Sequence, residues 1–228
     1  MQRPLRHIVT KMREPDYGLP VLLALLVLMG FVLPSLGLEG SNERLYGDIA
    51  ASLMLVSGVF VASGERWTFI LALLMTIATL ATRWAVWFSP PGALGAWPEL
   101  VACATILVFS LIILRQVIRP GEVNLSRVLG AIAVYLLLGI AWASAYQVAE
   151  HFFPSSFVSS TTQPASATDW IYFSFVTLTT VGYGDIVPVH RVARSLATGE
   201  ALAGQLYIAV LLARLVSLQV SSRHRPNG

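Results

Sequence analysis

The fold of this chain is decided by one stretch in its C-terminal half, Thr177-Leu178-Thr179-Thr180-Val181-Gly182-Tyr183-Gly184-Asp185. Its two glycines, Gly182 and Gly184, stand at alternate positions. Because glycine enters the left-handed backbone region without a Cβ penalty, the stretch can alternate between right- and left-handed conformations. This alternation turns successive backbone carbonyls toward one axis, where a ring of oxygens can surround a dehydrated cation. The plainer alternative is a buried glycine-rich turn between two apolar helices.

The composition indicates a membrane protein. The chain has 228 residues, of which 56% are hydrophobic and only 12% are charged, whereas soluble domains carry about 25% charged residues. The net charge of +3 does not indicate nucleic-acid binding, because the basic residues flank apolar stretches. The single cysteine, Cys103, cannot form a disulfide within the chain. The HExxH, GxSxG and phosphate-loop motifs are missing, so we expect no enzyme activity.

Several stretches are long enough to cross a bilayer, which takes about 20 apolar residues. We expect an all-α membrane protein with six transmembrane helices, over residues 19–38, 46–63, 67–88, 97–118, 125–149 and 191–220. A further apolar segment, 169–179, is too short to cross and is expected to be a re-entrant helix. Ser166 and Asp169 fit a capping pattern at its start. The Ser/Thr/Pro-rich segment 154–168 is expected to be an exposed loop.

The run TVGYGD, residues 180–185, lies between this short helix and the last span. In that setting it resembles the selectivity filter of tetrameric potassium channels of the voltage-gated-like superfamily, specifically the small prokaryotic six-span members. The resemblance is specific over 121–218 and covers only the layout over 19–118. It implies a homotetramer, because one chain supplies one oxygen to each ring. It further implies that K+ is coordinated at Thr180, Val181, Gly182 and Tyr183, with Gly184 completing the filter.

The resemblance also identifies residues that support the filter. Tyr172 and Phe173 match an aromatic pair that props the filter in this family, where both members are often tryptophan. The hydroxyl of Tyr172 could reach Asp185, whereas Phe173 has no donor for Tyr183. Thr177 belongs to the same group of supporting residues.

Glu200 is unusual because it places a carboxylate inside the last span, at a cost of about 3 kcal/mol on insertion scales. It should therefore face protein or water. One interpretation is a structural clamp, with Glu200 neutral or hydrogen-bonded to Ser174 or Thr177 of the short helix. The other is a proton-sensitive gate.

Farther along the last span, Gly204 matches the family's hinge glycine. Close helix packing is an equally good explanation for a small residue at this position. The side chains of Gln205, Ile208 and Leu212 fall on one helical face and are candidates for lining an inner cavity.

The chain divides into four parts by these criteria. They are an N-terminal segment 1–18, a peripheral four-helix unit 19–120, a pore unit 121–220 and a short tail 221–228.

Eleven of the 15 basic residues fall on the side that holds both termini, with only Arg44, Arg83, Arg191 and Arg194 on the other. The positive-inside rule therefore predicts cytoplasmic termini in a multi-pass protein of the cell membrane.

The peripheral unit resembles a voltage sensor in layout but lacks its arginine series. Every third residue through the fourth span is uncharged until Arg115. We therefore expect weak or no voltage dependence. Asp48, Arg83 and Glu99 lie near the outer ends of their helices and are expected to pair for structural reasons.

These features together predict a potassium-selective channel that conducts K+ passively. The implied partners are K+, membrane lipid and three identical subunits, without nucleic acid and without a cofactor beyond the permeant ion. A poorly selective cation channel is one alternative. A potassium uptake transporter is less favoured, because such chains carry four non-identical pore loops. A non-conducting membrane regulator with a structural remnant of a pore is a further alternative.

Overall fold

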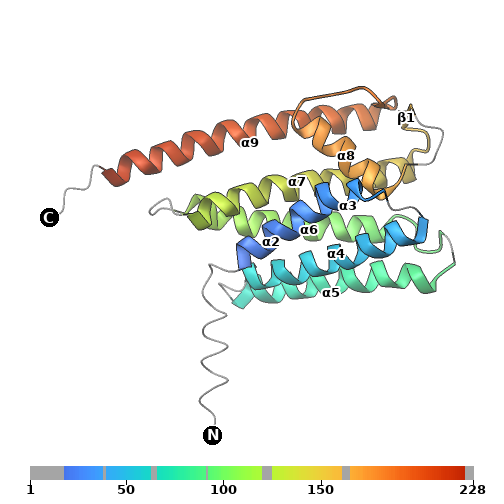
Figure 1. Cartoon of the computed structure of the whole chain (residues 1–228), viewed down its shortest axis with the longest axis horizontal. Coiled ribbons are helices and arrows are strands. Elements are labelled where there is room, and N and C mark those ends of the chain that lie inside the picture. The colour runs from blue at the N-terminus through green and yellow to red at the C-terminus, as the bar shows by residue number, and fades with distance from the viewer. Residues whose placement is uncertain are drawn as a thin grey trace, which may run out of the picture.

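The computed structural model describes residues 18–37, 40–62, 66–90, 92–119, 125–160 and 165–223. The chain is almost entirely helical over these residues (Figure 1). Its elements are α2 (Gly18–Val27), η1 (Leu28–Val32), α3 (Leu33–Ser35), α4 (Gly40–Val61), α5 (Arg66–Phe88), α6 (Trp97–Ile118), α7 (Leu125–Phe152), β1 (Phe157–Ser159), α8 (Ala167–Leu178), β2 (Ile186–Pro188) and α9 (Arg191–Arg223).

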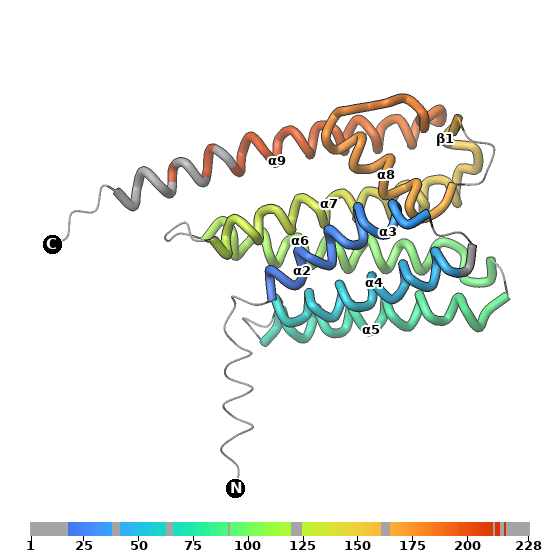
Figure 2. Tube along the Cα trace, in the orientation of Figure 1, coloured from blue at the N-terminus to red at the C-terminus, as the bar shows by residue number. Residues whose placement is uncertain are grey.

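The helices form two groups that share a boundary at α7. Helix α2, together with α4, α5 and α6, forms the peripheral bundle, and α7 packs against both α6 and α2. The short helix α8 lies between α7 and α9 (Figures 1 and 2). The core runs continuously through both groups, with fully buried side chains that include Leu22, Met54, Phe109, Leu137 and Tyr146.

Five helices in the described part of the chain are long and apolar enough to cross a membrane. They cover Gly18–Ser35, Asn42–Val61, Arg66–Phe88, Trp97–Ile118 and Leu125–Phe152. These agree with the first five expected spans, and the fourth has the expected limits. The long helix α9 is not one of the five, so a sixth crossing stays a prediction.

The first expected span is interrupted rather than regular. A π-helical turn, Leu28–Val32, separates α2 from α3, and α3 ends at Ser35. Pro34 gives a physical reason, because it has no N–H to donate to the carbonyl of Gly30 and its ring crowds that carbonyl. The helical ladder is therefore disturbed over the preceding turn. The end of this expected span at residue 38 lies outside the described residues.

The expected exposed loop at 154–168 is wrong in part. Its Phe157–Ser159 segment forms strand β1, which pairs antiparallel with β2 at Ile186–Pro188, placing Phe157 opposite Pro188. Ser156 at its start is buried, and the amide of Ser160 donates to the carbonyl of Asp185 at 2.8 Å. This two-stranded ribbon fixes the chain immediately after the glycine-rich stretch. Residues 161–164 lie outside the described residues.

Candidate functional site

The short helix α8 begins with a complete capping box. The hydroxyl of Ser166 accepts a hydrogen bond from the amide of Asp169 at 3.3 Å, and the Asp169 carboxylate accepts from the amide of Ser166 at 2.8 Å. The expected cap is therefore confirmed. Thr168 in the same turn donates to the carboxylate of Glu43 at 2.6 Å. This bond ties the start of α8 to the start of α4, and both carboxylates lie at the favourable positive end of the helix.

The glycine-rich stretch begins directly after α8 and turns its first amides back toward the helix. The amide of Thr180 donates to the carbonyl of Thr177, and the amide of Val181 donates to that of Val176, each at 2.9 Å. Among the described residues, no carbonyl from Thr180 to Tyr183 accepts a hydrogen bond. These carbonyls therefore remain available to another ligand.

The backbone of this stretch alternates in hand. Left-handed φ angles occur at Thr180 (59°), Gly182 (58°) and Gly184 (80°), with none at the residues between them. This confirms the alternation expected at the two glycines. Thr180 was not expected to be left-handed, because a β-branched residue is strained there. In this conformation the amide of Thr180 donates its hydrogen bond to the carbonyl of Thr177.

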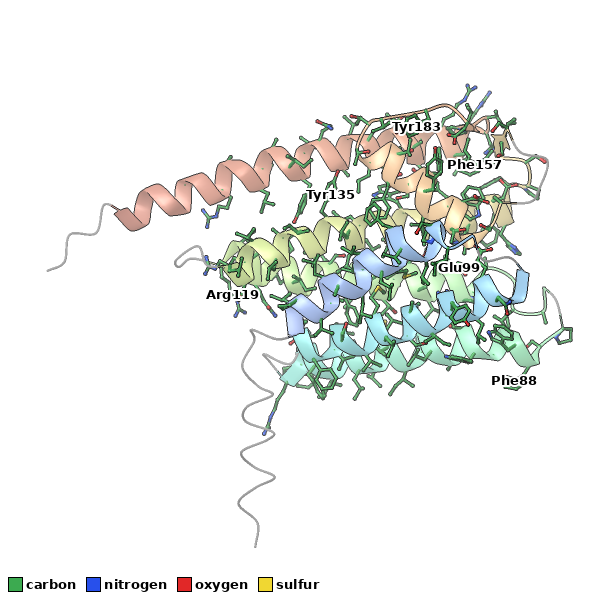
Figure 3. The ribbon with its side chains drawn as sticks, viewed as in Figure 1. Phe88, Glu99, Arg119, Tyr135, Phe157 and Tyr183 are labelled. Atoms are coloured by element: carbon green, nitrogen blue, oxygen red, sulfur yellow. The ribbon has the colours of Figure 1, made fainter. Side chains whose placement is uncertain are left out.

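The stretch lies at an open edge of the chain. Tyr183 is 71% exposed and Val181 is 53% exposed. Figure 3 shows Tyr183 at the margin beyond α8, on the opposite side of the molecule from Phe88 of the peripheral bundle. The exposed face continues along α9, where Leu206 is 62% and Val210 is 66% exposed. An apolar surface of this kind on one chain indicates further packing partners.

Tyr172 and Asp185 make the contact that the sequence suggested. The Tyr172 hydroxyl donates to the Asp185 carboxylate at 2.7 Å. Its ring lies parallel to that of Tyr183, with centroids 6.5 Å apart and an angle of 4°. A tyrosine hydroxyl is protonated at neutral pH, so Tyr172 is the donor and the Asp185 carboxylate is the acceptor. The role of this contact in supporting the filter stays a prediction.

Phe173 takes a different position from its neighbour. Phe173 is buried. Its ring packs edge to face with the rings of Tyr146 and Phe157, at centroid distances of 4.9 Å and 5.4 Å. Trp170 meets Phe157 in the same manner. The structure thus joins α7, α8 and β1 through an aromatic cluster that sequence reasoning missed. Tyr146 and Phe157 gave no separate signal, because an aromatic residue in or near an apolar span is typical of core.

Glu200 is fully buried and clamps α8, as the structural interpretation expected. One carboxyl oxygen contacts the hydroxyl of Ser174, and the other accepts from the hydroxyl of Tyr146. Ser174 also lies 2.6 Å from the carbonyl of Gly139. Of the two partners considered, Ser174 is the one that the described structure shows. Tyr146 and Gly139 were not recognised from the sequence.

Gly204 has a clear packing role. A Cβ at this position would stand 2.2 Å from the carbonyl oxygen of Leu178, at the end of α8. Tyr135 of α7 donates to the same carbonyl at 3.4 Å, from between α7 and α9 (Figure 3). The close approach of α9 to α8 therefore requires glycine, while a hinge at Gly204 stays a prediction.

The proposed cavity residues follow Gly204 on α9. The side-chain amide of Gln205 donates to the hydroxyl of Thr180 at 3.4 Å. Ile208 is exposed on the single chain. The side chain of Leu212 lies outside the described residues.

The polar residues of the peripheral bundle are mostly paired. Asp48 is buried and accepts from Arg83 at 2.7 Å and from Trp87 at 2.9 Å, while Arg44 lies 3.9 Å from it. The expected pairing of Asp48 with Arg83 is confirmed. Glu99 forms no ion pair within the described part of the chain. The expected boundary between the two units, between residues 120 and 121, lies outside the described residues.

Comparison with known proteins finds similar sequences among ion channels. Residues 132–220, fewer than half of the chain, match the family described as "Ion channel". The chain is 46% identical over 48 residues to inward rectifier potassium channel Kirbac3.1 of Paramagnetospirillum magnetotacticum, covering 21% of this chain and 16% of that protein. It is 33% identical over 102 residues to two-pore potassium channel 1 of Arabidopsis thaliana, covering 44% and 25% respectively. Protein LctB of Bacillus caldotenax is 36% identical over 94 residues, covering 40% of this chain and 63% of that protein.

These matches indicate a channel and not an enzyme. They support the potassium-channel superfamily, and together with the five apolar helices they support a multi-pass membrane protein. The chain spans between 16% and 26% of the length of four of the potassium channels it matches. No solved structure matches the chain.

Proposed function

We propose that this chain supplies one quarter of a potassium-selective channel through which K+ passes passively. The observation that carries the proposal is the alternating hand of Thr180, Gly182 and Gly184, combined with carbonyls that accept no hydrogen bond in the described part of the chain. A dehydrated K+ ion needs a ring of oxygens to replace its water shell, and four such strands around an axis supply it.

The carbonyls of Thr180, Val181, Gly182 and Tyr183 are the proposed K+ ligands, with Gly184 at the outer end. The C-terminal end of α8, at Leu178, carries partial negative charge from the aligned peptide dipoles of the helix. Four such ends pointed at one cavity lower the cost of holding a cation within the membrane. This favours a cation over an anion on the inner side of the filter.

A homotetramer in lipid is part of the proposal. One chain provides one oxygen to each ring, so three identical subunits are needed to complete the pore. The exposed apolar side chains Leu202, Leu206, Ile208 and Val210 of α9 support this arrangement. In a tetramer they become inner-cavity or subunit-contact residues.

The topology is proposed from charge, with both termini cytoplasmic and the filter mouth outside. The first four helices are proposed to respond weakly or not at all to voltage. Arg83, a basic residue within a peripheral span, is held at 2.7 Å by Asp48. A paired charge of this kind moves little in the membrane field.

The test is ion flux into liposomes that contain the purified protein, measured for K+ and Na+ with and without Ba2+. We expect K+ flux to exceed Na+ flux strongly and to be blocked by Ba2+. Gly182→Ala should abolish this flux, because an L side chain is strained at its φ of 58°. Gly47→Ala is the matched control, since a Cβ there meets nothing within 4 Å.

The other outcomes separate the alternatives. Equal K+ and Na+ flux would contradict selectivity and favour a poorly selective cation channel. Absence of both flux and tetramers would favour a non-conducting membrane regulator.

A further inference from the structure

The buried carboxyl of Glu200 lies where three helices of the pore half meet. Glu200 of α9, Tyr146 of α7 and Ser174 of α8 are each 0% exposed. Tyr146 donates its hydroxyl to one oxygen of the carboxyl, and Ser174 contacts the other at 2.5 Å. In the described part of the chain, the titratable side chains that interact electrostatically with it are Tyr146 and Tyr135, both on α7. Within the described part of the chain, no cation forms an ion pair with Glu200.

Counting hydrogens assigns a proton to this carboxyl. The Ser174 hydroxyl lies 2.6 Å from the Gly139 carbonyl as well as 2.5 Å from the Glu200 oxygen. A serine hydroxyl has one hydrogen, and a backbone carbonyl can only accept. If that hydrogen goes to Gly139, the contact with Glu200 needs a second hydrogen. Among the described contacts of Ser174, only the carboxyl can supply it.

If Glu200 were ionised, the site would lack one hydrogen and would hold an uncompensated charge. A carboxylate would accept the Ser174 hydrogen, and the Ser174 and Gly139 oxygens would then face each other at 2.6 Å with no hydrogen between them. It would also place a full negative charge in a buried site that has no opposite charge among the described residues, which is costly. A neutral acid satisfies every one of these contacts.

We propose that Glu200 is held as a neutral carboxylic acid that completes a directed chain of hydrogen bonds from Tyr146 through Glu200 and Ser174 to the carbonyl of Gly139. The chain joins α9 to α7 and to the middle of α8, three residues before Thr177. Glu200 is thus a positioning residue for the helix that carries the filter, and this second part rests on the proposed function. The protonation state stands independently of it.

Infrared spectroscopy of the protein in lipid at neutral pH tests the protonation state. The wild-type spectrum should contain a carbonyl stretch of a protonated carboxylic acid that Glu200→Gln removes. Glu150→Gln is the matched control: Glu150 accepts from the amides of Ser155 and Ser156, so this change should remove a carboxylate band instead. Loss of a carboxylate band in Glu200→Gln would overturn the proposal.

A second variant keeps the test independent of how Glu200→Gln folds. Ser174→Ala should shift the protonated-acid band to higher frequency, because the acid hydrogen loses its acceptor. An unshifted band would contradict the hydrogen-bond chain. These measurements need folded protein but no ion flux, so the proposed function and this assignment can fail separately.

The positioning role is tested by rescue with the isosteric amide. Glutamine can donate to Ser174 and accept from Tyr146, whereas alanine can do neither. We expect Glu200→Gln to keep the wild-type ratio of K+ to Na+ flux, and Glu200→Ala to lower it about tenfold. Equal losses in the two variants would overturn the role, and so would an unchanged ratio in Glu200→Ala.

Discussion

The contact between Tyr172 and Asp185 links α8 to the outer end of the proposed filter. Its hydroxyl donates at 2.7 Å, and its ring lies parallel to that of Tyr183. The neighbouring Phe173 is buried in an aromatic cluster and has no donor. In the proposed filter, this one bond would therefore do what an aromatic pair does in the family that the sequence resembles. Filter stiffness should therefore depend on it.

We predict that Tyr172→Phe lowers the K+ to Na+ permeability ratio while leaving the fold intact. The change removes an exposed hydrogen bond to a carboxylate, which contributes about 1 kcal/mol after screening by water. Reversal potentials in planar bilayers measure the ratio. Tyr207→Phe is the control, because Tyr207 donates at 2.7 Å to the carbonyl of Ala131 away from the filter. Equal effects of the two changes would contradict a specific role for Tyr172.

Two glycines on α9 differ in what a methyl group would meet. At Gly204 a Cβ would stand 2.2 Å from the Leu178 carbonyl, whereas at Gly199 the nearest atom belongs to Trp142 at 3.6 Å. We predict that Gly204→Ala destabilises the protein by about 1–3 kcal/mol through overpacking. Gly199→Ala should be neutral or gain up to about 1 kcal/mol from helix propensity. Thermal unfolding of both variants checks this, and equal midpoints would refute the packing role.

At the scale of elements, Phe175 connects the peripheral bundle to the pore helix. Its ring fills a slot between Gly139 of α7 and Gly30 of η1, and it lies 5.3 Å from the ring of Phe31. The π-helical turn thus meets α8 close to the start of the filter. The Phe175 ring makes this contact by packing on Gly30 and Gly139 and beside the ring of Phe31.

We predict that Gly139→Ala displaces Phe175, because its Cβ would stand 2.6 Å from the ring. The expected destabilisation is about 1–3 kcal/mol. The double variant Gly139→Ala/Phe175→Leu should recover part of this loss, since the smaller side chain leaves room for the methyl group. Denaturation in detergent measures each variant. Failure of the second change to recover any stability would contradict the slot.

The sequence was sufficient for elements whose causes are local. The helix at Trp97–Ile118 and the capping box of Ser166 and Asp169 depend on neighbours within a few residues. Strands β1 and β2 were missed, because their pairing joins Phe157–Ser159 to Ile186–Pro188 and neither three-residue segment has a strand pattern of its own. Tyr146 was missed for a similar reason, since its partner Glu200 lies on another helix.

For the whole molecule, the charge pattern predicts a pore that is insensitive to voltage. A charge moving through the membrane contributes about 2.3 kcal/mol per 100 mV. Arg83 is fixed to Asp48 at 2.7 Å, and Arg115 lies in the last turn of α6. We predict that currents in symmetrical K+ vary linearly with voltage and that Arg115→Gln leaves this unchanged. A steep voltage dependence that Arg115→Gln removes would contradict the prediction.

The central claim is that four copies of the Thr180–Asp185 stretch form a potassium filter. The most direct test is the reversal potential of the purified protein in planar bilayers, with KCl on one side and NaCl on the other. We expect a reversal potential far from zero, in the direction set by K+, and its collapse in Gly182→Ala. A reversal potential at zero in a conducting wild-type tetramer would contradict it.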